Sequence, residues 1–287
     1  MRILLFSMEL KGEARNTYQV LVDALQSNDC TLFQYNNPES SLLNHIPIIY
    51  TTEQLKNHKI DMVISAGGDG TMLKAVSFGG DSGIPFLGFN LGRLGFLAVI
   101  EKDDLYSMVR SIKSGFYTLE PRTTICIQSN APVFEDNSFG LNDFTLLKRD
   151  NSSMIKIHTT LNNEFLNTYW ADGLILATPT GSTGYSLSCG GPIIFPQSGN
   201  FVLTPIAPHN LNVRPIVISD DSVLEFKVEG RTENFLCTLD SKYGLITSEH
   251  IITLKRNAFD INLVKIQGTS FLKTLRDKLM WGLDLRN

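Results

Sequence analysis

A glycine-rich turn, Gly67-Gly68-Asp69-Gly70-Thr71, constrains the fold more than any other stretch of this 287-residue chain. It follows an apolar run at residues 62–66 that is typical of a buried strand, and a helical pattern begins at Thr71. Backbone N–H groups at such a strand-to-helix turn can bind phosphate. The carboxylate of Asp69 would repel phosphate. We therefore expect it to accept a hydroxyl proton or help to place a cation, the alternative being a plain position near the helix N-cap.

The first 115 residues alternate between strand-like and helix-like segments. Strands are predicted at 2–7, 31–35, 62–66 and 85–89, helices at 12–25 and 102–115, and a loop with a helical piece at 36–50. This alternation predicts a parallel sheet covered by helices on both faces. Such sheets bind ligands at the carboxyl ends of their strands, and the glycine-rich turn follows one of these ends.

The pattern changes after Gly115. Runs of alternating and β-branched residues, separated by Gly, Asn, Asp and Pro, predict an all-β, sandwich-like domain at 116–267. Residues 270–281 are helical again, and we expect this helix to return to the first domain. The predicted α/β domain is therefore discontinuous and comprises 1–115 plus 268–287, while the β domain completes the ligand site.

Composition excludes several classes of protein. A net charge of −4 disfavours nonspecific binding to nucleic acid, and no apolar stretch approaches the roughly 18 residues of a membrane span. The apolar start is short and predicts a strand, not a signal peptide. The four cysteines are scattered and form no Cys/His cluster, so we expect reduced thiols, a cytoplasmic protein and no protein-built metal site.

A second motif spans residues 170–193 and includes Thr178-Pro179-Thr180-Gly181-Ser182-Thr183-Gly184-Tyr185. Its glycines allow close approach to the backbone, and its hydroxyl groups suit a base or a ribose, unless it is an ordinary Gly/Ser loop. Asn142 and Asp143 are unusual residues for a strand interior and could bind ribose hydroxyls, or mark a turn. His209, in a proline-restricted segment, is expected to form structural hydrogen bonds.

These stretches, in this order, resemble the NAD kinase family. The resemblance rests on five matches along nearly the whole chain: Gly67–Thr71, Asn90-Leu91-Gly92 with Leu94-Gly95-Phe96, Asn142-Asp143, Asp172-Gly173 through Thr178–Tyr185, and Pro205–His209. The glycine motif alone is moderately specific, because lipid kinases of the diacylglycerol type carry a similar one. The run beginning at Thr178 with its Asp172-Gly173 prefix is highly specific.

The resemblance implies an α/β domain and a β domain with NAD between them, in homodimers or homotetramers. ATP would be the donor with Mg²⁺ or another divalent metal, and neither nucleic acid nor membrane would be a partner. Asp69 would be the catalytic base toward the 2′-hydroxyl of the adenosine ribose. The donor phosphates would be bound by Gly67, Gly68, Gly70 and Thr71, and NAD by Asp69, Gly70, Asn142, Asp143, Asp172, Thr183, Gly184, Tyr185, Ser186, Leu187, Ser188 and Ala207.

The chain departs from the family pattern at three places. Asp143 stands where many members have Glu, Gly184 where many have Ala, and Trp170-Ala171 where some have a basic residue before the Asp-Gly pair. The first two exchanges keep the chemistry. Two other functions are also considered, a lipid kinase with the same glycine turn and a dinucleotide sensor in which Asp69 only anchors ribose.

Overall fold

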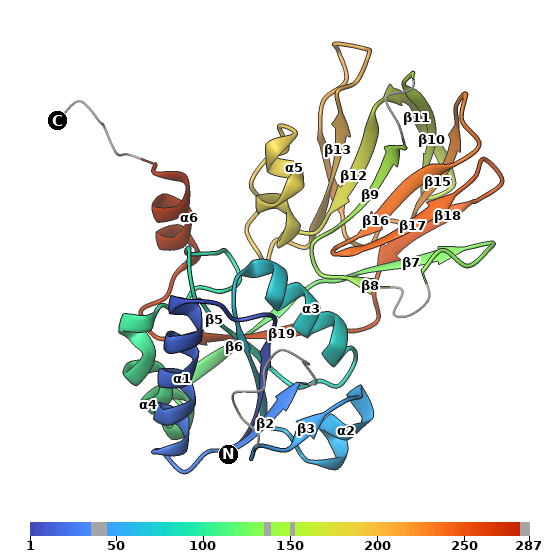
Figure 1. Ribbon diagram of the computed structural model, residues 1–287. Helices are drawn as coiled ribbons and strands as arrows, with labels where there is room; N and C mark the ends of the chain where they lie inside the picture. The colour runs from blue at the N-terminus through green and yellow to red at the C-terminus, as the bar shows by residue number, and fades with distance from the viewer. Residues whose placement is uncertain (36–44, 135–138, 150–152, 282–287) are drawn as a thin grey trace. The chain divides into compact units, whose positions relative to one another are not determined.

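The computed structural model describes residues 1–35, 45–134, 139–149 and 153–281. The chain divides into two compact units, Met1–Glu120 with Ile261–Asn287, and Pro121–Asp260 (Figure 1). These boundaries lie a few residues from the expected ones, because strands β6 and β19 join the sheet of unit 1. Most of the loop with a helical piece that was expected at 36–50 lies outside the described residues.

Unit 1 contains a sheet whose neighbouring strands are parallel from β3 through β19. The strand order is β3-β2-β1-β4-β5-β19-β6, so the chain reverses its direction across the sheet between β1 and β4. Ligands of open α/β sheets bind outside the carboxyl ends of strands at such a switch point. The strands are β1 (Arg2–Ser7), β2 (Thr31–Tyr35), β3 (Ile48–Ile49), β4 (Met62–Ala66), β5 (Phe86–Phe89), β6 (Tyr117–Arg122) and β19 (Ile261–Ile266).

Helices cover both faces of this sheet because its strands are apolar on both sides (Figure 1). Ile3 and Leu5 of β1 belong to the core that α1 and α4 cover, whereas the ring of Phe6 lies 6.0 Å from that of Phe78 of α3. The predicted parallel, doubly covered sheet is therefore confirmed. The helices are α1 (Glu13–Gln26), α2 (Thr52–Asn57), α3 (Asp69–Gly79), the 3-10 turn Lys102–Asp104 and α4 (Leu105–Ser114).

The last helix, α6 (Phe271–Leu279), belongs to unit 1, as expected from its sequence. Its N-cap Ser270 accepts a hydrogen bond from the N–H of Lys273 at 3.2 Å. Phe271 lies 6.4 Å from the ring of Phe96, and Lys278 donates to the carbonyl of Leu94. The helix thus contacts the segment that follows β5.

Unit 2 is a sandwich of two antiparallel sheets, ordered β11-β10-β15-β18-β7-β8 and β14-β13-β12-β9-β16-β17. Alternate residues of both sheets form one core, in which Phe144 and Phe226 stack at 6.3 Å. The strands are β7 (Ile125–Ser129), β8 (Phe139–Gly140), β9 (Asp143–Lys148), β10 (Ile155–Leu161), β11 (Glu164–Ala171), β12 (Gly173–Ala177), β13 (Asn200–Ile206), β14 (Ile216–Ser219), β15 (Leu224–Glu229), β16 (Phe235–Leu239), β17 (Lys242–Ile246) and β18 (Ile252–Arg256).

Between β12 and β13 the chain forms a 3-10 turn at Gly181–Thr183 and the single-turn helix α5 (Tyr185–Ser188). This is the short helix expected after the Thr178 run. Among the described residues, no helix has both the length and the apolar character needed to cross a membrane.

Candidate functional site

The glycine-rich turn joins the carboxyl end of β4 to the N-terminus of α3, at the switch point of the sheet. The N–H of Thr71 returns to the carbonyl of Gly68 at 3.0 Å. The amides of Gly68, Asp69 and Gly70 have no helical carbonyl one turn before them, because the helix begins here. A Cβ at Gly67 would lie 2.4 Å from the Thr71 hydroxyl, so the turn requires glycine there. The turn therefore places backbone amides at a helix N-terminus, where the helix dipole is positive.

The carboxylate of Asp69 is held by the backbone of a later loop. Its Oδ2 accepts the N–H of Phe96 at 2.8 Å, and its Oδ1 accepts those of Leu97 and Ala98 at 2.9 and 3.0 Å. The N-cap of α3 is Gly68, and the Asp69 side chain does not cap the helix. A carboxylate has about four acceptor positions, so three are occupied and one position on Oδ2 remains for a hydroxyl.

The loop that holds Asp69 is itself fixed at its start by Asn90, which is 4% exposed. The Asn90 side chain accepts the N–H of Gly92 at 2.6 Å and donates to the carbonyl of Arg93. A Cβ on Gly95 would lie 2.0 Å from Asp69 Oδ1, so the carboxylate can approach only glycine. The Asn90–Phe96 match therefore has a structural role, which is to receive the Asp69 carboxylate.

In unit 2, the predicted residues meet at the ends of two neighbouring central strands. Asn142 precedes β9 and Thr178 follows β12, and the Thr178 N–H donates to the Asn142 carbonyl at 2.8 Å. The Thr178 hydroxyl donates to Leu141 O at 2.6 Å and accepts from the Gly181 N–H at 3.1 Å. A Cβ at Gly181 would lie 2.1 Å from the Asn142 carbonyl oxygen, so this glycine permits the contact.

Most hydroxyl groups of the Thr178–Ser188 loop form hydrogen bonds inside the protein. Ser182 donates to Pro179 O at 2.6 Å, and Thr183 to Thr180 O at 3.1 Å. Ser186 is fully buried and shares a hydrogen bond with Thr204 at 2.8 Å. These hydroxyls therefore shape the loop, whereas Tyr185 and Ser188 are exposed.

Asp143 and Asp172 both act electrostatically on the phenol of Tyr185. Burial, with Cys189 next and then Asp172 and Asp143, raises the pKa of the Tyr185 phenol. Burial and the charge of Asp240 raise the pKa of the Asp143 carboxyl to about 7, while the Thr145 hydroxyl opposes the shift. The structure thus brings these three predicted site residues together in unit 2.

Asp172 and Ala207 are held by the strands beside them. Asp172 Oδ1 pairs with Lys148 Nζ at 2.7 Å, and the Asp172 N–H donates to Ile206 O at 3.0 Å. Exposed Ala207 has a φ of 44°, a conformation that non-glycine residues rarely adopt and that clusters at functional sites. The backbone N–H of His209 donates to Trp170 O at 2.8 Å, and its ring lies 5.1 Å from that of Trp170.

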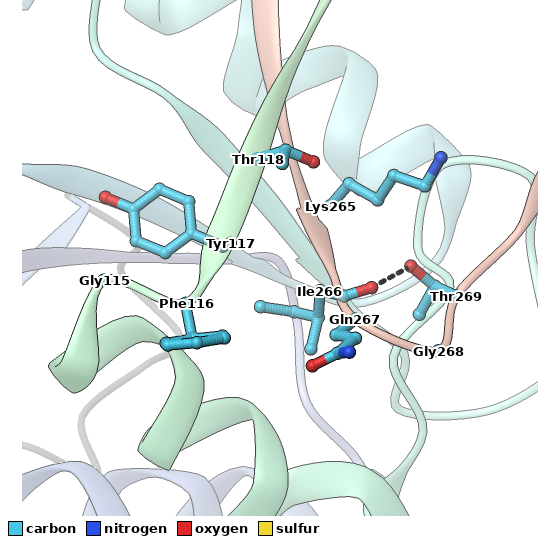
Figure 2. Close-up of a pocket in the computed structure, with 9 residues that line it drawn as sticks. All are labelled: Gly115, Phe116, Tyr117, Thr118, Lys265, Ile266, Gln267, Gly268 and Thr269. Atoms are coloured by element: carbon cyan, nitrogen blue, oxygen red, sulfur yellow. Dashed lines mark hydrogen bonds between the residues drawn. The ribbon is translucent and has the colours of Figure 1, made fainter.

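Unit 1 also contains a pocket of about 490 Å³ (Figure 2). It is lined by residues 115–118 and 265–269, and the Thr269 hydroxyl donates to Ile266 O at 2.7 Å. None of the predicted site residues lines it. The described ranges also contain no group of three or more His, Cys, Asp or Glu side chains placed to hold a metal ion.

Sequence reasoning missed two features of these sites. One is Asp240, between β16 and β17, whose carboxylate accepts the N–H groups of Leu141, Asn142 and Asp143. The other is the bond from Asp69 to the loop after β5. In both cases the carboxylate and the amides that it accepts are far apart in the sequence. The local sequence showed only a carboxylate beside a turn, which does not identify its partners.

Both halves of the chain match known family models. Residues 9–117 match the ATP-NAD kinase N-terminal domain, and residues 141–265 match the ATP-NAD kinase C-terminal domain. An NAD kinase of Cytophaga hutchinsonii is 49% identical over 244 residues, covering 84% of both chains. An NAD kinase of Flavobacterium psychrophilum is 42% identical and covers 100% of both chains.

Two solved structures share the fold. Yeast NADH kinase complexed with NADH has a TM-score of 0.89 at 21% identity, covering 100% of this chain and 89% of its own. An NAD kinase from Archaeoglobus fulgidus in complex with ATP has a TM-score of 0.78 at 24% identity, covering 98% and 99%. On the family models and the relatives together, the chain belongs to the NAD kinase family.

Proposed function

We propose that this protein is an NAD kinase, which transfers the γ-phosphoryl group of ATP to the 2′-hydroxyl of the adenosine ribose of NAD and forms NADP. Its relatives of 42–49% identity are named NAD kinases and span most or all of the chain. The observation that carries the mechanism is Asp69, a carboxylate with one acceptor position left, at the start of a helix suited to phosphate.

The donor phosphates would be bound by the glycine-rich turn of unit 1. The amides of Gly68, Asp69 and Gly70 lie at the N-terminus of α3, where the helix dipole favours negative charge. Gly67 allows the turn to close against Thr71, whose hydroxyl is a further hydrogen-bond donor. Because phosphoryl transfer depends mainly on positioning and charge stabilisation, these groups would supply much of the catalysis in unit 1.

Asp69 would accept the proton of the attacking hydroxyl. Three N–H donors already stabilise the negative charge of its carboxylate, so its first effect would be to orient the hydroxyl through Oδ2. The proton would move as the new bond to phosphorus forms, when the hydroxyl becomes acidic. The loop that holds the carboxylate thereby fixes the direction from which the hydroxyl is received.

Unit 2 would recognise the NAD molecule. The buried Oδ1 of Asn142 has no hydrogen-bond partner in the described part of the chain, so it can accept from a donor such as the adenine amino group. Asp143 and the segment Thr183–Ser188, with exposed Tyr185, would contact adenine and ribose. Asp172, oriented by Lys148, would approach the nicotinamide half, and Ala207 would line the pocket.

A divalent metal would be held mainly by the donor. Mg²⁺ takes oxygen ligands and keeps several waters, and the part of the chain that the structure describes offers no carboxylate cluster for it. When bound, the ion would neutralise charge on the donor phosphates. The family resemblance also supports a homodimer or homotetramer, which light scattering of the purified protein would decide.

A coupled assay tests the proposal. The protein is incubated with ATP, Mg²⁺ and NAD, and NADP is detected with a dehydrogenase that accepts only NADP. A lipid kinase would instead phosphorylate diacylglycerol, and a sensor would bind NAD in calorimetry without forming NADP. Repeating the assay with NADH and with polyphosphate defines the acceptor and donor ranges.

Asp69→Asn tests the role of the carboxylate. We expect turnover to fall at least ~100-fold, the usual contribution of a general base, while NAD still binds in calorimetry. The Asn side chain would also turn an NH₂ group toward the loop amides, so part of the loss reflects a disturbed loop. Turnover like that of the unmodified enzyme would refute the assignment.

A further inference from the structure

The turn between β16 and β17 places a carboxylate beneath two of the residues proposed to bind adenosine. Asp240 Oδ2 accepts the N–H of Leu141 at 2.7 Å, and its Oδ1 accepts those of Asn142 and Asp143 at 2.8 and 3.1 Å. Three successive backbone amides are thus fixed by one side chain from a distant part of unit 2. Hydrogen bonds to a charged acceptor contribute about twice as much as neutral ones.

The contact also runs in the opposite direction. The N–H of Asp240 donates to the carbonyl of Asp143 at 3.0 Å, so backbone and side chain together clamp the segment 141–143. Asp240 has a φ of 52°, which Asp tolerates better than most residues. A Cβ on Gly140 would lie 3.2 Å from Asp240 Oδ1 and 2.8 Å from Leu239, so glycine there leaves room for the carboxylate.

The clamp supports more than its own strand. The carbonyl of Asn142 receives the N–H of Thr178, from which the loop leading to Tyr185 departs. We propose that Asp240 is a positioning residue, which fixes the backbone of 141–143 and thereby directs the side chains of Asn142 and Asp143 toward NAD. The inference about NAD rests on the proposed function, whereas the clamp itself does not.

The charge of Asp240 has a second effect, on the protonation of Asp143. Burial and then this charge raise the pKa of the Asp143 carboxyl to about 7. The hydroxyl of Thr145, on the same strand, opposes this shift. Asp143 itself acts on the phenol of Tyr185, as does Asp172, which is paired with Lys148. Removing the Asp240 charge should therefore lower the pKa of Asp143.

Two variants of Asp240 separate these contributions. Asp240→Asn keeps one acceptor oxygen and removes the charge, and Asn also tolerates a positive φ. Asp240→Gly removes both carboxylate oxygens, and with them all three hydrogen bonds, at a φ that glycine adopts freely. The matched control is Asp220→Asn, because Asp220 is also a buried carboxylate of unit 2 but pairs with Arg256 at 3.0 Å, away from 141–143.

Three measurements are compared across the variants. Hydrogen exchange of the amides of 141–143 should accelerate in Asp240→Asn and further in Asp240→Gly. The KM for NAD should rise about tenfold in Asp240→Asn, which is about 1.4 kcal/mol, and about a hundredfold in Asp240→Gly. The KM for ATP should stay within about twofold, and the pH midpoint of NAD binding in Asp240→Asn should move to lower pH.

The control fixes the meaning of each result. Asp220→Asn should change neither the exchange of these amides nor the KM for NAD. Equal losses for NAD and ATP in the Asp240 variants would overturn the positioning role. An unchanged pH midpoint would overturn the effect of the Asp240 charge on Asp143. If the unmodified protein forms no NADP, the proposed function fails. Hydrogen exchange then still tests the clamp. Unchanged protection of the amides of 141–143 in the Asp240 variants overturns it, and lost protection supports it.

Discussion

Replacing Asp143 with Asn should stabilise unit 2 at neutral and alkaline pH and have little effect near pH 4. The native Asp143 carboxyl is buried beside Asp240, which raises its pKa from the ordinary 3.8 to about 7. The unfolded chain ionises this group near pH 4, whereas the folded protein holds the proton until about pH 7. Native stability is therefore lost as the pH rises through this window, and the loss is complete above pH 7.

The magnitude follows from the pKa difference. Each unit corresponds to about 1.4 kcal/mol, so a shift from 3.8 to about 7 removes up to about 4 kcal/mol of stability above pH 7. Between pH 5 and pH 8 the contribution changes by about 3 kcal/mol. Asn cannot ionise, so the stability difference between Asp143→Asn and the native chain should grow by about this amount from pH 5 to pH 8.

Unit 2 can be followed separately because the chain has two tryptophans, Trp170 in unit 2 and Trp281 in unit 1. In a Trp281→Phe background, Trp170 fluorescence reports the urea unfolding of unit 2. With a slope of about 2 kcal/mol per molar urea, the midpoint difference between the two proteins should widen by roughly 1 to 2 M from pH 5 to pH 8.

Asp221→Asn is the control, since it removes an exposed carboxylate from the same unit. It should leave the change of midpoint with pH as it is in the background protein. A difference between Asp143→Asn and the background that stays constant from pH 5 to pH 8, or shrinks, would refute the reasoning about the buried carboxyl.

Two glycine substitutions test the close contacts of the sites. Gly95→Ala would place a Cβ 2.0 Å from Asp69 Oδ1, so we expect turnover to fall at least about tenfold and the protein to lose about 1–3 kcal/mol in urea unfolding. Gly92→Ala, with no atom within 4 Å of its Cβ, should keep the turnover and stability of the unmodified protein. Equal turnover and stability of the two variants would contradict the close contact between Gly95 and Asp69. In Gly181→Ala the new Cβ would lie 2.1 Å from a backbone oxygen, so the free energy of unfolding should fall by about 2–3 kcal/mol. In Gly184→Ala the nearest atom is 3.2 Å away, so the fall should be less than about 1 kcal/mol. A larger fall for Gly184→Ala than for Gly181→Ala would be inconsistent with the packing.

The local pattern of the sequence predicted the fold class and most of the elements correctly. The turn at Gly67–Thr71 lies between a buried strand and a helix, the β-rich region forms a sandwich, and the last helix belongs to unit 1. These features are set by neighbouring residues, through hydrophobic period, glycine conformations and turn residues. The missed helix Thr52–Asn57 also had a local signal, a capping box of Thr51 and Gln54.

The sheet to which a strand belongs was a tertiary decision. Strands β6 and β19 have sequences that fit a β domain, yet they extend the sheet of unit 1. A strand's residues determine that it is extended and which faces are apolar, but several partners can satisfy the same pattern. Which sheet a strand joins depends on which sheet has an unpaired edge strand within its reach.

The chain's own residue types fixed which chemical groups were available, and only the tertiary structure decided what they do. From the sequence, Asp69 was a carboxylate in a phosphate-binding turn, and the Thr178–Ser188 hydroxyls were candidates for ligand contact. The fold directs Asp69 onto three amides of the loop after β5, turns most of those hydroxyls inward, and recruits Asp240 to Asn142 and Asp143. The physical reason is separation: these hydrogen bonds join residues up to 99 positions apart, and strand pairing and packing alone bring such partners together.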